Sequence, residues 1–182
     1  FIAGLCQNHG ENLAIYYFSE EHEVARERIA AGASRQEAAR EVLGVAFSEL
    51  GAATAEIWSL PQVIITAIGG VPDGEVPAPA DEEEAIRNFC VLANELCASF
   101  HGCDGAELTE RLETLCGRFV TNTGLNAEFL FKLFEAAFEK LKQFAPIFEI
   151  NVAESVFCKS VEAWLAHRRS VAEADPAAAA TG

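Results

Sequence analysis

Apolar residues recur at helical spacing along most of the chain, with short connections between the periodic stretches. Stripes of this kind are usually a buried core or the seam with a partner helix. The pattern therefore predicts an all-α fold. The clearest stripes comprise Phe129, Leu130, Leu133, Phe134, Ala137, Phe138 and Leu141, and then Phe157, Val161, Trp164 and Leu165.

Local start and stop signals divide this pattern into helices. Ser34 and Glu37 form a capping box, and Gly44 stands where a left-handed C-cap is expected. Residues 69–80, GGVPDGEVPAPA, should interrupt regular structure and form the longest internal linker. The expected helices run from Ser34 to about Leu43, from Phe47 to Trp58, from Pro61 onward, from Asp81 to about Phe100, from Glu107 to about Asn122, from Asn126 to Pro146, and from a cap at residues 151–154.

Residues 41–70, EVLGVAFSELGAATAEIWSLPQVIITAIGG, hold several motifs in a fixed order. They include Leu43-Gly44, Glu49-Leu50-Gly51 and a Trp-Ser-Leu-Pro junction that ends at Pro61. This stretch resembles the second half of an HDOD domain, the output-domain relative of the HD metal-dependent phosphohydrolases. Residues 1–10, FIAGLCQNHG, resemble the family's helix that carries the HD pair, and residues 91–96, VLANEL, resemble its Ala-Asp-x-Leu segment.

The resemblance implies an HD-superfamily-like helical bundle over residues 1–100, of which this is the C-terminal part, with further helices expected upstream. A smaller helical extension should follow at residues 101–170, and residues 171–182 should be a disordered tail.

The positions that hold metal in HD enzymes carry other residue types here. In those enzymes the metal ion lowers the pKa of a bound water, so that hydroxide can attack phosphorus. No imidazole or carboxylate stands at the six positions, so we expect no catalytic residues, no bound metal and no cofactor. The emptied pocket could take a small polar ligand or could be filled by packed side chains. The six residues are Gln7, Asn8, Phe47, Gly69, Gly70 and Asn94.

Other candidate chemistry is sparse. Cys90, Cys97 and His101 could share a helix face and, with Cys103 nearby, form part of a metal site, but free cysteines commonly pack as small hydrophobic residues. His9 points away from Gln7 on a helix, and we expect it to face solvent or to be hydrogen-bonded locally.

Charge and hydropathy narrow the partners. A net charge of −15 disfavours nucleic acids and anionic membranes, which attract basic surfaces. No apolar run is long enough to span a bilayer and no signal peptide is evident, so we expect a cytoplasmic protein.

The resemblance implies a non-catalytic regulatory module of a bacterial multidomain signalling protein. Its partner would be another protein or a fused domain such as a kinase, a cyclic-dinucleotide enzyme or a receiver. Two alternatives stay open. One is a residual metal-dependent phosphodiesterase, and the other is an oligomerisation element in which the phenylalanine-rich helix 126–144 forms a homodimer.

Overall fold

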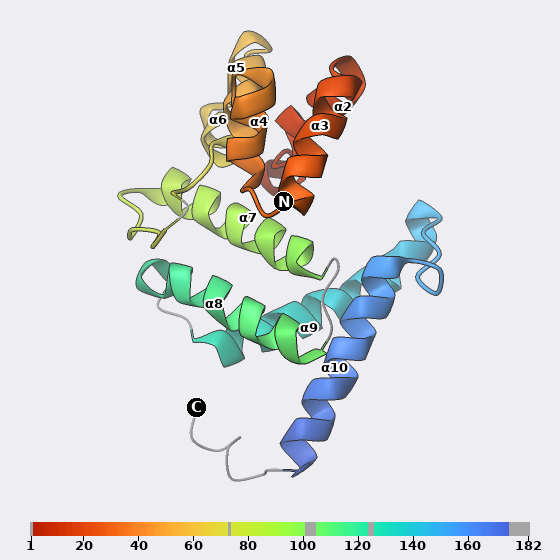
Figure 1. Ribbon diagram of the computed structural model, residues 1–182. Helices are drawn as coiled ribbons and strands as arrows, with labels where there is room; N and C mark the ends of the chain where they lie inside the picture. Colours follow the sequence, from red (N-terminus) through yellow and green to blue (C-terminus); the bar gives the residue numbers. More distant parts are fainter. Residues whose placement is uncertain (1, 73, 101–104, 124–125, 175–182) are drawn as a thin grey trace. The chain divides into compact units, whose positions relative to one another are not determined.

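The computed structural model describes residues 2–72, 74–100, 105–123 and 126–174. These residues form helices and contain no strand, which confirms the predicted all-α fold (Figure 1). In chain order the helices are α1 (Ile2–Leu5), α2 (His9–Tyr17), α3 (Ser19–Ala30), α4 (Arg35–Leu43), α5 (Phe47–Ile57), α6 (Gln62–Ile68), α7 (Glu82–Ser99), α8 (Gly105–Thr123), α9 (Ala127–Phe144), the 3-10 helix η1 (Ala145–Phe148) and α10 (Val156–Ala174).

The chain divides into two compact units, Phe1–Asn94 and Glu95–Gly182, and the division falls inside α7. In the first unit α3 packs on α4, and α2 packs on α5. Small side chains allow these helices to approach closely, and one large ring fills the space that is left. The core of this part consists of Ala14, Ala25, Ala38, Ala39 and Phe47, with Ile29, Ala33, Val42 and Leu43 packed against it.

Two glycines make the contact between α2 and α5 possible. A Cβ atom on Gly10 would lie 1.8 Å from the carbonyl oxygen of Phe47 and 2.7 Å from the amide nitrogen of Gly51. A Cβ atom on Gly51 would in turn lie 2.9 Å from the amide nitrogen of Gly10. Backbone therefore meets backbone at this crossing, and neither position has room for a side chain.

The predicted helix starts are confirmed around α4 and α5. Ser34 Oγ accepts from the amide of Glu37 at 3.2 Å, and Glu37 accepts in return from the amide of Ser34 at 3.4 Å. Gly44 ends α4 with φ of 78°, in the left-handed region that glycine tolerates. At the start of α5, Glu49 accepts from the amide of Ala46 at 2.9 Å.

Glu49 also joins α5 to α4. Its carboxylate pairs with Arg40 at 2.7 Å, and this hydrogen bond, together with the one from the Ala46 amide, lowers the pKa of Glu49. Both side chains of the pair are about half exposed, so the interaction is screened by solvent.

The second unit is built around one tryptophan. Trp164 of α10 is 1% exposed, and its indole N–H donates to Thr109 Oγ1 of α8 at 3.1 Å. Its ring meets those of Phe100 and Phe131 edge-on, at centroid distances of 5.5 and 5.4 Å. Phe134 stacks on Phe100 at 5.0 Å. This aromatic cluster holds α8, α9 and α10 together.

Two predictions in the second unit were wrong. Residues 151–154 form a turn instead of a cap, and the side chain of Ser155 accepts from the Cys158 amide at the start of α10. A serine directly before the first helical residue is the better placed acceptor. Helix α10 continues to Ala174, so residues 171–174 are helical; the rest of the predicted tail lies outside the described residues.

The apolar stripe of α9 is only partly buried. Phe129 and Leu133 are 52% and 55% exposed, whereas the neighbouring Leu130, Phe131 and Phe138 are buried. The packed face is therefore rotated towards Phe131, because an apolar sequence pattern this wide leaves the direction of packing open.

In the part of the chain that the structure describes, no helix combines the length and the hydropathy that a membrane span requires.

Candidate functional site

The first two residues of the predicted site lie in a turn, between α1 and α2. The sequence resemblance placed residues 1–10 on one helix, and this expectation was wrong at residues 6–8. Asn8 precedes α2 with φ of −96° and ψ of 18°, and its side chain makes no capping bond there. Asparagine competes poorly in helix interiors, because its amide bonds to other groups instead. The turn thus frees the Asn8 side chain to reach another helix.

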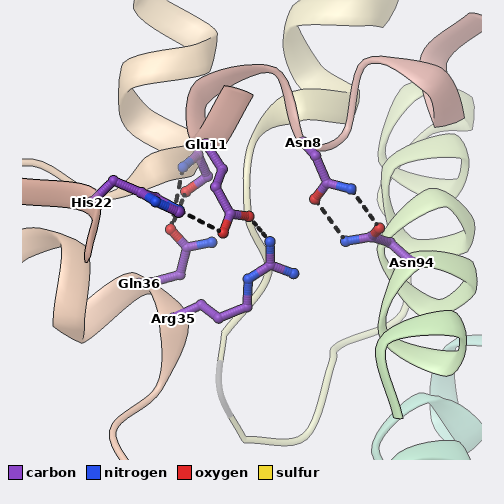
Figure 2. A network of polar contacts seen from close by, with 7 residues as sticks. Asn8, Glu11, His22, Arg35, Gln36 and Asn94 are labelled. Atoms are coloured by element: carbon purple, nitrogen blue, oxygen red, sulfur yellow. Dashed lines mark hydrogen bonds and ion pairs between the residues drawn. The ribbon is translucent and has the colours of Figure 1, made fainter. Parts of the chain in front are cut away.

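Asn8 bonds to Asn94 of α7. The Asn8 side-chain nitrogen donates to Asn94 Oδ1 at 2.9 Å, and the Asn94 nitrogen donates back to Asn8 Oδ1 at 3.2 Å. Figure 2 shows the two amides facing each other across the space between the turn and α7. Both residues are half-buried, and the paired amides satisfy one donor and one acceptor on each side. Neutral hydrogen bonds thus join two positions at which the sequence resemblance implied metal-binding residues.

Gln7 points to a different element. Its side-chain nitrogen donates to the carbonyl oxygen of Ala67, near the end of α6. The last carbonyls of a helix lack partners within the helix, so this bond satisfies a group that the fold would otherwise leave open. Gln7 therefore fastens the turn to α6, while Asn8 fastens it to α7.

The glycines and the phenylalanine of the predicted site have packing roles. A Cβ atom on Gly69 would come within 3.1 Å of the Thr66 carbonyl oxygen, and one on Gly70 within 3.2 Å of Ser48 Oγ. Phe47 is 4% exposed and belongs to the alanine-rich core between the helices. Of the six predicted residues, the structure brings Asn8 and Asn94 into direct contact and ties Gln7 to α6.

These residues do not fit a divalent metal ion. Amide oxygens carry no net charge, and those of Asn8 and Asn94 already accept hydrogen bonds; Phe47 and the two glycines offer no side-chain donor. Within the described residues, no group of three His, Cys, Asp or Glu side chains could hold a metal ion. The cysteine and histidine site considered from the sequence depends on His101 and Cys103, which lie outside the described residues.

His9 differs from the expectation of a solvent-facing or locally bonded side chain. Its Nε2 atom is buried and has no hydrogen-bond partner, and its ring centroid lies 5.0 Å from that of Trp58. His9 opens α2, which packs against α5, and Trp58 directly follows the last residue of α5.

A polar network beside the site was missed at the sequence level. Glu11 of α2 pairs with Arg35 of α4, and His22 Nε2 of α3 lies 3.4 Å from the Glu11 carboxylate (Figure 2). The side chains of Glu11 and His22 are 18% and 13% exposed. No motif joins residues at these separations, so only the helix packing reveals that Glu11 connects three helices.

Comparison with known families agrees with the first part of the sequence interpretation. Residues 1–71 match the family model of the HDOD domain. The match includes five of the six predicted site residues and ends before Asn94. Neither a curated protein nor a solved structure matches the chain.

Proposed function

We propose that the chain is a non-catalytic regulatory module. The premise is that residues 1–71 form an HDOD domain, and hence a signalling-related, HD-like domain. It acts through contact with another protein or with a fused signalling domain, such as a kinase, a cyclic-dinucleotide enzyme or a receiver. A partner that prefers one packing of the helices over another would shift the population between them and so transmit its state. In this proposal the module works inside the cytoplasm of a bacterial cell.

The reciprocal bond between Asn8 and Asn94 is the observation that carries this proposal. Hydrolysis in the HD manner requires ionised carboxylates and neutral imidazoles around the metal, because these groups provide the charge and the lone pairs that hold it. Two of the corresponding positions are occupied by amides that bond to each other at 2.9 and 3.2 Å. Binding a metal there would require breaking both hydrogen bonds in exchange for two neutral ligands.

The same bond bears on a small-molecule role for this region. A polar ligand between the turn and α7 would have to replace the hydrogen bonds of Asn8, Asn94 and Gln7 with equally good ones. We therefore propose that the regulatory contact is made on the protein surface. Titration with nucleotides and cyclic dinucleotides tests the alternative, in which a ligand binds at these residues.

Metal content and hydrolysis test the proposal together. The purified chain is incubated with manganese, iron, nickel or zinc, dialysed, and measured by elemental mass spectrometry. It is then assayed with a phosphodiester substrate and with cyclic dinucleotides. We expect substoichiometric metal and no turnover; stoichiometric metal with hydrolysis would establish the residual phosphodiesterase instead.

Thiols need a control in this experiment, because the chain has six cysteines that can bind zinc. A Cys97→Ser/Cys103→Ser variant separates zinc held by thiolates from metal held at the HD positions. Metal that disappears in this variant leaves the proposal intact, whereas metal that persists with activity contradicts it.

A second candidate function is favoured by one observation on α9. Phe129 and Leu133 lie one helical turn apart and are each more than half exposed. A homodimer could bury this strip. Sedimentation over a concentration series should then show a mass that rises with concentration and falls back in a Leu133→Ala variant; a monomer at every concentration refutes this role.

A further inference from the structure

A shallow pocket opens on the surface of the first unit, and its lining does not include the asparagine pair. Its volume is about 240 Å³, and the ends of several helices form it. Phe18 joins α2 to α3, and Val45 lies in the connection from α4 to α5. We name it the Phe18 pocket, and its lining residues are Phe18, Glu21, Val42, Leu43, Val45 and Leu50.

The size of the Phe18 pocket suits one side chain. Sites for small molecules and cofactors usually measure about 300–1,000 Å³ and bury most of the ligand. At about 240 Å³ and open to solvent, this pocket is too small to enclose a nucleotide. A single aliphatic side chain presented by another protein would fit it, as anchors at protein interfaces do.

Among the described residues of the lining, one is charged: Glu21, in the first turn of α3. Within the described residues its carboxylate has no ion pair. The chain cannot readily supply one, since residues 1–94 contain fifteen acidic residues, five arginines and no lysine. Each of these arginines already pairs with another acidic residue: Arg26 with Glu23, Arg28 with Glu41, Arg35 with Glu11, Arg40 with Glu49 and Arg87 with Glu84.

Two exposed aromatic residues directly precede Phe18 in the chain. Tyr16 and Tyr17 are 80% and 68% exposed, and their rings contact each other edge-on at 5.0 Å directly before Phe18. Tyrosine and phenylalanine are enriched at protein interfaces, where they supply large contact areas at a small cost in side-chain entropy. Apolar lining, an unpaired carboxylate and the exposed tyrosines that precede Phe18 in the chain together describe a surface that is complementary to a basic, partly apolar segment.

We propose that the Phe18 pocket docks a basic amphipathic helix of a partner protein. One aliphatic side chain of that helix fills the pocket, and a lysine or arginine one turn away on the same face pairs with Glu21. This inference rests on the proposed function as a module that acts through protein contact, and it specifies the chemistry of the partner. The excess negative charge of the unit would also attract such a helix before it docks.

Three labelled peptides of equal length provide the probe. The first places leucine and lysine on one helical face, the second has the same composition in scrambled order, and the third replaces lysine by glutamate. Binding to the full chain is followed by fluorescence anisotropy at an ionic strength of about 0.15 M, where long-range attraction is screened. We expect the amphipathic basic peptide to bind, the scrambled peptide to bind more weakly and the acidic peptide not to bind.

Matched variants locate the contact. Glu21→Gln should weaken binding by about two- to fivefold, the range of an exposed ion pair. Glu27→Gln removes the same charge from the same helix outside the pocket lining and should leave the affinity within about twofold. Val45→Phe should fill the pocket and weaken binding by about tenfold or more, because the aliphatic anchor loses its burial. Thermal melting checks that each variant is folded.

Backbone amide shifts in NMR spectra should change at the pocket residues when the peptide is added. Equal binding of the scrambled peptide, equal effects of Glu21→Gln and Glu27→Gln, or shifts spread over other acidic surfaces would each overturn the docking site. Sedimentation that shows self-association lost in Glu21→Gln would identify a second copy as the occupant and also overturn it. None of these results changes the metal and hydrolysis assays, so the regulatory proposal fails or survives separately.

Discussion

Replacing Gly10 by alanine should push α2 and α5 apart. The new Cβ atom would lie 1.8 Å from the Phe47 carbonyl oxygen, whereas ordinary contacts begin near 3.4 Å. The atoms in the way belong to the backbone of α5, which has no rotamer to change, so the helices themselves must move. Overpacking of this kind costs about 3 kcal/mol, near the upper end of the usual range.

A second effect opposes this cost. Alanine is more favourable than glycine inside a helix by about 1 kcal/mol. The steric cost is larger, and the net loss of unfolding free energy should be about 2 kcal/mol. With a urea dependence of about 1–3 kcal/mol per molar, the midpoint of the first unit's transition should fall by about 1 M.

Gly117→Ala provides the matched control. Gly117 lies within α8, and a Cβ atom there would meet no atom within 4 Å. This variant should be stabilised by about 1 kcal/mol through helix propensity alone. Urea unfolding followed by circular dichroism, with hydrogen exchange by mass spectrometry, assigns each change to residues 1–94 or to the second unit. A Gly10→Ala midpoint equal to or above that of wild type would refute the proposed backbone contact.

Three further results should follow from the same contacts. Asn8→Ala and Asn94→Ala should each cost about 1–3 kcal/mol in unfolding free energy because each strands the other amide, and the double variant should cost less than their sum in a double-mutant cycle by urea unfolding. The guanidinium of Arg40 that bonds to Glu49 lowers the pKa of Glu49, so the contribution of Glu49 to stability should be present above the ordinary value of 4.5 and be lost as the pH falls further. The unfolding free energies of wild type and Glu49→Gln should therefore converge in acid. A difference that grows in acid would contradict this. Burial raises the pKa of the Cys116 thiol to about 11, and the carboxylate of Glu113 is the smaller cause. Iodoacetamide at pH 8 should therefore label exposed Cys97 well before buried Cys116, which mass spectrometry can check.

The residues that the resemblance places at the HD positions illustrate why residue types can be read from the sequence while their contacts cannot be foreseen. The absence of imidazoles and carboxylates follows directly from reading Gln7, Asn8 and Asn94 in register with the family motifs. The new bonds do not follow, because the register says nothing about where an amide will find a partner. Asn8 selects Asn94, whereas Gln7 selects a backbone carbonyl of α6.

Helix ends were predicted well where the signal is local. Ser34 with Glu37, and Gly44 after α4, act on groups within four residues, so their effect is present in the sequence itself. The prediction failed where two local signals competed, as when Ser155 instead of Asn151 became the acceptor at α10. The wide apolar stripe of α9 left the direction of its packing open, and Phe129 lies on the exposed side.

The sequence by itself therefore determined the helical class, most helix boundaries and the match of residues 1–71 to the HDOD family model. Only the tertiary structure decided the contact of Gly10 with α5, the bond of Asn8 to Asn94 across 86 positions and the Phe18 pocket. The reason is physical. Capping and periodicity act within a few residues, whereas these features depend on how closely helices distant in sequence can approach one another.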